Sequence, residues 1–188
     1  MNRRIVPALA ALLVVAGLAG CGIQPESSPT AIDRPFQPTT SPTSAPNPAG
    51  TIRETLYLVR DGMLVAVTRH VSRPPTVESL LAELYGAPSD TERESGLTSA
   101  LLGTNPVAAV HQIGTQVVIE LAAPVAGSPR TDDQLAFGQI VCTLTSLPDV
   151  NTVMFTHNQQ PIGVPRGDGS VSTVALTSAD YTTMMAPN

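Results

Sequence analysis

The residues best placed for chemistry stand near the start of the chain, where a cysteine follows two small residues. Leu18, Ala19 and Gly20 directly precede Cys21. The thiolate of a cysteine is a nucleophile and can form a thioether. Small residues before it allow the backbone to enter a narrow protease groove. Cys21 is therefore the candidate residue for covalent modification through its thiol.

The residues that precede Cys21 have the three parts of a secretory signal. Arg3 and Arg4 give a positive start, residues 5–18 are uncharged and mostly apolar, and small residues end the segment. A transmembrane anchor is the alternative, but a span needs about 20 apolar residues and this run is shorter. We therefore predict that residues 1–20 are a cleaved signal peptide, exported by the general secretion route.

This segment resembles the lipobox of bacterial lipoproteins, in which an obligatory Cys receives a diacylglycerol and its freed amine is often acylated. The resemblance implies that Cys21 is the lipidation site and carries acyl chains such as palmitate. Each buried methylene contributes about 0.8 kcal/mol, and two or more chains anchor a protein stably. We expect a protein held by these chains on the extracytoplasmic face of the cell membrane.

Charge and cysteine content exclude several classes of function. All ten basic residues are Arg, and after loss of the signal eight remain against fifteen Asp and Glu, a net charge of −7. Such a chain offers no basic patch for phosphates, so nucleic acid is not an expected partner. Only Cys142 remains beside Cys21, so a packed core and not a disulfide must provide stability. The lack of Lys with abundant Ala, Pro and Arg fits an actinobacterial genome.

Residues 21–50 are predicted to be a disordered linker rich in Pro, Ser and Thr. The segment has few apolar residues and no periodicity, so it cannot bury enough surface to fold. At about 3.1 Å per residue, an extended Pro-rich chain would hold the following domain up to roughly 90 Å from the membrane. An inert spacer is the main interpretation. O-glycosylation of Thr39-Thr40-Ser41 and Thr43-Ser44 is the alternative.

The next part of the chain, residues 51–181, predicts strands grouped into hairpins with helices between them. Asp61-Gly62 marks a hairpin turn, because both central residues of a type I′ turn need positive φ. Thr131-x-x-Gln134 has the form of a capping box that begins a helix. The expected strands are 52–60, 63–71, 107–113, 116–122, 152–157 and 170–176, and the expected helices are 76–86 and 131–147, with a short helical turn after Ser89.

This order of elements indicates an α+β domain, in which an antiparallel or mixed sheet packs against two helices. The second helix should present one apolar stripe to the sheet. Leu97, Leu101 and Leu102 are expected to hold a loop onto the core. Residues 182–188 are expected to form a C-terminal tail.

Candidate metal and catalytic residues are scattered. His70, His111 and His157 have no second ligand at the spacing of a zinc site. Cys142 lies on an apolar side of the predicted helix, where a small buried side chain is a simpler interpretation than a nucleophile. The sequence contains no Gly-x-Ser-x-Gly elbow and no glycine pattern for a nucleotide. We expect no enzyme activity and no catalytic, cofactor-binding or metal site.

Two further motifs are explained by local structure. Arg166-Gly167-Asp168 spells an adhesion tripeptide, but flanking Pro165 and Gly169 favour a turn. Asp132 and Asp133 could be read as a calcium or acid pair. Their place at a predicted helix N-terminus explains them better, because carboxylates stabilise that end of a helix.

Seven segments of the predicted domain together resemble the GerMN domain of sporulation and germination proteins, which also occurs in actinobacterial lipoproteins. The likeness covers residues 51–181, and it depends on the order and spacing of packing patterns. Two loops depart from the family, at Leu102-Gly103 and at residues 157–160. The resembling segments are Leu56-Tyr57-Leu58, residues 77–84 with Gly86 and Pro88, residues 96–101, 117–121, 139–144, 148–150 and 153–155.

The resemblance implies a non-catalytic module on the outer membrane face, similar to ring-building folds of envelope complexes. We therefore expect a domain that binds another envelope protein, or itself, through a sheet edge or an apolar patch. The alternative is a carrier or sensor for a small envelope ligand, a lipid or glycan, in a pocket between helix and sheet. An exposed apolar patch on a closed core favours the first function, and a sizeable apolar cavity with convergent polar groups favours the second.

Overall fold

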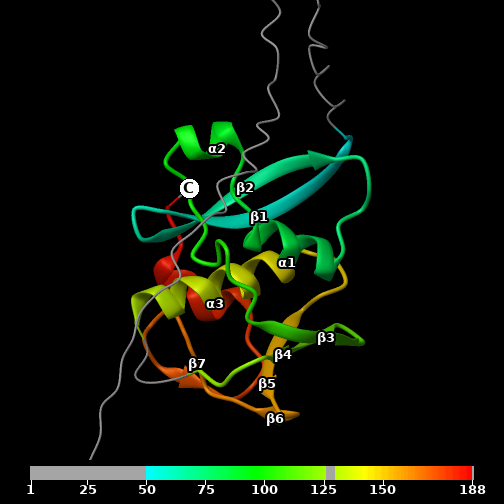
Figure 1. The fold of residues 1–188 in the computed structure, drawn as a ribbon, viewed down its shortest axis with the longest axis vertical. Coiled ribbons are helices and arrows are strands. Elements are labelled where there is room, and N and C mark those ends of the chain that lie inside the picture. The colour runs from blue at the N-terminus through cyan, green and yellow to red at the C-terminus, as the bar shows by residue number, and fades with distance from the viewer. Residues whose placement is uncertain (1–49, 126–129, 188) are drawn as a thin grey trace, which may run out of the picture. The chain divides into compact units, whose positions relative to one another are not determined.

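The computed structural model describes residues 50–125 and 130–187 (Figure 1). The predicted signal peptide, Cys21 and most of the predicted linker lie outside the described residues. In chain order, the elements are β1 (Ile52–Arg60), β2 (Met63–Val71), α1 (Val77–Tyr85), α2 (Asp90–Glu94), β3 (Val107–Ile113), β4 (Gln116–Leu121), α3 (Thr131–Leu144), β5 (Thr152–His157), β6 (Gln160–Pro161), β7 (Val164–Pro165), β8 (Val171–Ser172) and the 3-10 helix η1 (Ser178–Met184).

The first two strands form the hairpin that the sequence predicts. Asp61 and Gly62 have φ values of 54° and 73°, as a type I′ turn requires. The register of β1 and β2 is unbroken from Ile52 opposite Val71 to the turn. Since side chains alternate across a strand, one face of β1 is buried, and it carries Leu56 and Leu58.

The α+β class is confirmed, but the strands divide into separate sheets where we expected one. A four-stranded sheet has the order β3-β4-β5-β6, and β4 and β5 are parallel while the other pairs are antiparallel. Parallel neighbours need a long crossover connection, which α3 supplies here. The hairpin β1–β2 and the short pair β7–β8 stand apart from this sheet.

Helix α3 is the central layer of the domain and not the outer cover of a sheet. It contacts β1 and β2 on one side and β5 and β7 on the other, and Figure 1 shows it between the hairpin and the four-stranded sheet. Seven consecutive residues, 138–144, are therefore buried, so the expected single apolar stripe is wrong. A helix packed on several sides needs side chains that fit all of them.

Two polar residues of α3 are buried because they bind backbone groups of other segments. The Gln139 side chain accepts a hydrogen bond from the Ala100 N–H (2.6 Å) and donates one to the Tyr57 carbonyl (2.9 Å). The Thr143 hydroxyl accepts a hydrogen bond from the Tyr57 N–H (2.9 Å). Buried polar groups are stable only when paired in this way, so these bonds fix α3 against β1.

The ends of α3 differ from the prediction by a few residues. The N-terminal carboxylate cap is Asp133, whose Oδ2 accepts a hydrogen bond from the Arg130 N–H (3.2 Å), so the capping box starts one residue earlier than expected. The helix ends at Leu144 and not at residue 147. The hydroxyl groups of Thr145 and Ser146 donate to carbonyls of the last turn and so replace the helical pattern there.

The C-terminal segment is part of the packed domain. We expected a tail from residue 182, but η1 continues to Met184, which is buried, and the Ala186 N–H donates to the Leu64 carbonyl (2.8 Å). Leu102 is 52% exposed, so the expectation that it holds a loop onto the core is wrong. The expected last strand is reduced to β8 and one bridge between Val153 and Leu176.

Candidate functional site

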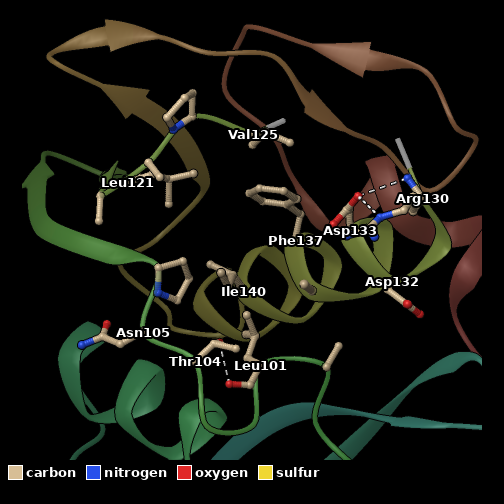
Figure 2. A pocket seen from close by; sticks show the side chains of 16 residues that line it. Leu101, Thr104, Asn105, Leu121, Val125, Arg130, Asp132, Asp133, Phe137 and Ile140 are labelled. Carbon is tan, nitrogen blue, oxygen red and sulfur yellow. Dashed lines mark hydrogen bonds and ion pairs between the residues drawn. The ribbon is translucent and has the colours of Figure 1, made fainter. Parts of the chain in front are cut away.

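A groove of about 640 Å³ opens between the first half of α3, the end of β4 and the loop that precedes β3. Figure 2 shows its side chains, and we call it the α3 groove. The segments that form it are far apart in the sequence and meet because α3 crosses the four-stranded sheet. Its lining residues are residues 100, 101, 104–106, 121–125, 130, 132, 133, 136, 137 and 140.

The floor of the α3 groove is apolar. Figure 2 shows the Phe137 ring at its centre, between Val125 and Ile140. The ring of Phe137 meets the ring of Phe155 edge to face, with centroids 4.9 Å apart and planes at 84°. This is a favoured geometry for aromatic pairs. It holds the Phe137 ring in place, so the apolar floor is formed before any ligand arrives.

The polar groups of the α3 groove gather at the N-terminus of α3 and in the loop before β3. Arg130 Nε lies 3.3 Å from Asp133 Oδ2, the oxygen that also caps the helix. The Thr104 hydroxyl donates to the Leu101 carbonyl (2.7 Å). Arg130, Asp133 and Thr104 are already paired within the domain, and the lining contains no Ser, Cys, His or Tyr. The groove is suited to apolar contact with a charged rim, not to nucleophilic chemistry.

The three histidines that the sequence analysis considered as metal ligands lie apart in the structure. His70 and His111 are exposed on β2 and β3. His157 is on β5, and its Nδ1 lies 2.9 Å from the Leu121 carbonyl oxygen. Within the described ranges, no three His, Cys, Asp or Glu side chains are grouped so that they could hold a metal ion.

Cys142 is buried in the middle of α3, with 1% of its surface exposed. Burial raises the pKa of its thiol to about 12. The thiolate is the reactive form of cysteine, so this residue is a small core side chain and cannot serve as a nucleophile at neutral pH.

Arg166-Gly167-Asp168 forms the predicted turn. The Gly169 N–H donates to the Arg166 carbonyl (3.0 Å), and Asp168 Oδ1 accepts a hydrogen bond from the Ser170 N–H (2.9 Å). Arg166 forms an ion pair with Asp180 of η1. Since its guanidinium and the Asp168 carboxylate are occupied within the domain, the tripeptide has a structural role.

Comparison with known families identifies the domain. A family model named Germane, with the description sporulation and spore germination, matches residues 42–163, which is more than half of the chain. The chain belongs to the Germane family. This match confirms the resemblance to GerMN domains, and Germane is a sporulation and germination domain, not a known enzyme family. No curated protein matches the sequence.

The Germane domain has structural neighbours with low sequence identity. The tandem GerMN domains of the sporulation protein GerM from Bacillus subtilis superpose with a TM-score of 0.52 at 20% identity. The match covers 70% of this chain and 47% of that one. The first GerMN domain of the same protein gives 0.41 at 19% identity, covering 58% and 84%. A Clostridium perfringens protein named "Putative Lipoprotein" gives 0.41 at 20%, covering 74% and 95%.

Two structural features of the Germane domain were not foreseen from the sequence. The first is the α3 groove, because Phe137 fits the single apolar stripe predicted for the second helix and carries no signal of its own. The second is a buried carboxylate, Glu54, on the inward face of β1. Glu54 alternates with Leu56 and Leu58 along β1, so it lies on the same buried face. This spacing is the signal that could have identified a Glu at a core position. Among the described residues, no helix has the length and apolarity needed to cross a bilayer.

Proposed function

We propose that this protein is a lipid-anchored lipoprotein of the extracytoplasmic membrane face, whose Germane domain binds another envelope protein without catalysis. The anchor is assigned to Cys21, because the residues before it have the order of a signal peptide and lipobox. The domain match and the named lipoprotein neighbour are compatible with this assignment.

The observation that carries the interaction role is the edge strand β3. Among the described residues, β3 pairs only with β4, so its outer edge has free backbone donors and acceptors. None of its seven residues is charged, and Ile113 at its end is 67% exposed. Soluble proteins usually protect such edges with charges, Pro or a β-bulge. In β3 the register shift stands at the start of the strand, between Val107 and Ala109, and leaves the end at Ile113 regular. An uncharged edge with an exposed apolar end is suited to pairing with a strand of a partner.

Substitution of Ile113 by Glu tests this role. The lipidated protein is crosslinked in its native membrane and recovered, and bound proteins are identified. One reproducible envelope protein should be lost with Ile113→Glu. The matched control is Val174→Glu, because Val174 is also apolar and 61% exposed but lies outside β3. Equal recovery with both variants would exclude the β3 edge as the contact.

The anchor needs its own test. In the parent, the mature N-terminal residue should be an acylated Cys21, and the acyl chains should be absent from Cys21→Ser. Mass spectrometry of the N-terminal peptide measures both. A parent protein without acyl chains on Cys21 would contradict the lipoprotein assignment.

A small-ligand carrier is the second candidate, and the α3 groove favours it. Its volume of about 640 Å³ lies within the range of about 300–1,000 Å³ for small-molecule sites. Ala136→Phe would fill the groove, whereas Ala82→Phe on exposed α1 surface is the control. A lipid or sugar that copurifies by mass spectrometry with the parent and the control, but not with Ala136→Phe, would identify a carrier.

A further inference from the structure

Four charged side chains from four elements meet beside the hairpin β1–β2. Arg69 of β2 binds Glu92 of α2 with two hydrogen bonds, from Nε to Oε1 (2.9 Å) and from Nη2 to Oε2 (2.7 Å). Its Nη1 binds Glu83 of α1. The fourth member is Glu54 of β1, which lies directly opposite Arg69 in the strand register. Three carboxylates thus lie around one guanidinium, and two of them bind it.

Glu54 is the member of this cluster without a cation of its own, and its protonated carboxyl hydrogen-bonds to Glu83. It is 3% exposed, and its Oε1 has no hydrogen-bond partner among the described residues, although Arg69 is its cross-strand neighbour. The nitrogens of Arg69 are committed to Glu83 and Glu92. A buried ionised carboxylate is stable only when it is paired, so Glu54 either keeps a proton that it shares with Glu83 or binds a cation.

A pocket gives access to this carboxylate. A pocket of about 400 Å³ is lined by Glu54 and Glu83, by Pro74 and Pro75 of the loop between β2 and α1, and by Ser79 of α1. The Ser79 hydroxyl is occupied in the cap of α1. The pocket therefore offers two carboxylates and two proline rings. It shares no lining residue with the α3 groove.

We propose that this pocket binds one organic cation, an ammonium or a guanidinium group, between Glu54 and Glu83. Both groups donate strong charge-assisted hydrogen bonds to carboxylates, and an alkyl stem would lie along Pro74 and Pro75. A metal ion is not favoured, since no group of three suitable ligands exists in the described ranges. The site goes beyond the proposed contact at β3 and does not depend on it.

Binding of a cation must compete with a proton. Burial, then Glu83, raises the pKa of Glu54 to about 7, while Arg69 opposes this shift. The cation binds the ionised form, so the proton of Glu54 passes to solvent. The binding-competent fraction is about 0.1 at pH 6 and about 0.9 at pH 8, and the apparent affinity should therefore rise about tenfold over this range.

Other charged groups lie near Glu54 and affect the competition between the cation and the proton. Arg73 in the loop lines the same pocket and is exposed, without an ion pair among the described residues. Arg53 and Asp149 line a neighbouring pocket that also includes Glu54. Glu92 is held ionised by Arg69, which lowers its pKa to about 2. Glu54 is therefore the group that gains or loses a proton near pH 7.

Calorimetric titration of the mature lipidated protein in detergent tests the proposal. The probes are N-acetyl-arginine methylamide and N-acetyl-lysine methylamide for a partner's side chain, and putrescine for a free amine. N-acetyl-norleucine methylamide is the uncharged control. Titration in two buffers of different ionisation enthalpy gives the protons released. We expect saturable binding of a charged probe, about tenfold tighter at pH 8 than at pH 6, with about 0.9 proton released at pH 6.

The variants separate this site from its alternatives. Glu54→Gln should abolish binding, whereas Arg73→Gln should preserve or strengthen it, because Arg73 repels the probe or competes with it. Ile113→Glu should not change it, so failure of the β3 contact and of this site are distinguishable. Tighter binding of the arginine or lysine amide would indicate a side chain of a partner protein as the natural ligand, and tighter binding of putrescine would indicate a free amine. Binding that is independent of pH or unchanged in Glu54→Gln, or no binding of any cation up to 10 mM (about the weak limit of such sites), would overturn the proposal.

Discussion

Replacement of Glu54 by Gln should stabilise the domain at neutral pH and above, with little effect near pH 4. The carboxyl is 3% exposed, and burial is the main reason that its pKa rises from 4.5 to about 7. A raised pKa means that the folded state prefers the neutral form. The stability that this form provides is complete below pH 4.5 and is lost as the pH rises through 7.

The magnitude follows from the two pKa values. At about 1.4 kcal/mol for each pH unit, the interval from 4.5 to about 7 corresponds to about 3 kcal/mol. The Gln amide stays neutral at every pH and keeps nearly the same shape. Glu54→Gln should therefore raise the free energy of unfolding by up to about 3 kcal/mol at pH 8 and by nearly nothing at pH 4.

Urea denaturation followed by circular dichroism at pH 4, 6 and 8 measures this difference. Losses that the parent and the variant share at low pH, such as protonation of Glu92, cancel in the comparison. The control is Glu78→Gln, since Glu78 is an exposed carboxylate of the same helix that carries Glu83. A Glu54→Gln protein that is no more stable than the parent at pH 8, or equally stabilised at pH 4, would refute the reasoning.

Three other substitutions have expected outcomes in the same urea assay. Glu92→Gln should cost about 2 kcal/mol at pH 7 by weakening the bidentate bond with Arg69, and this cost should shrink as the pH falls from 4.5 towards 2. Gly138→Ala should cost about 1–3 kcal/mol although Ala favours helices, because its Cβ would lie 2.7 Å from the Leu64 side chain. The control Gly86→Ala has no contact under 3.4 Å and should be neutral. Gln139→Leu should cost about 2–4 kcal/mol by leaving two backbone groups unpaired, and a variant as stable as the parent would contradict that role.

The local features of the fold could be predicted because each depends on a few adjacent residues. The turn at Asp61-Gly62 needs positive φ, and the cap at Ser89 needs a Glu three residues later. Both are found where expected. The position of α3 between two sheets could not be predicted in this way, because the contacts of its polar residue Gln139 lie on distant segments.

The candidate sites depend even more on tertiary contacts. The α3 groove is made by segments whose patterns read as core or loop, and Phe137 is apolar in either setting. Glu54 carries a clearer signal, since it shares the inward face of β1 with Leu56 and Leu58. Its lack of a cation could not be inferred, because the sequence does not show that Arg69 binds Glu83 and Glu92 instead.

The attachment of the C-terminal segment to the first hairpin has a consequence for how the domain acquires its fold. Tyr181 is completely buried, and Ala186 and Met185 pair with Leu64, so contacts join the two ends of the domain. Contacts between residues so distant in sequence slow folding, because a long loop must close first. A chain that emerges with its N-terminus first carries the hairpin β1–β2 without these partners until almost all of the domain has appeared. Folding should therefore be completed only after synthesis or export of the whole domain, and a chain interrupted before Tyr181 should stay open to proteases.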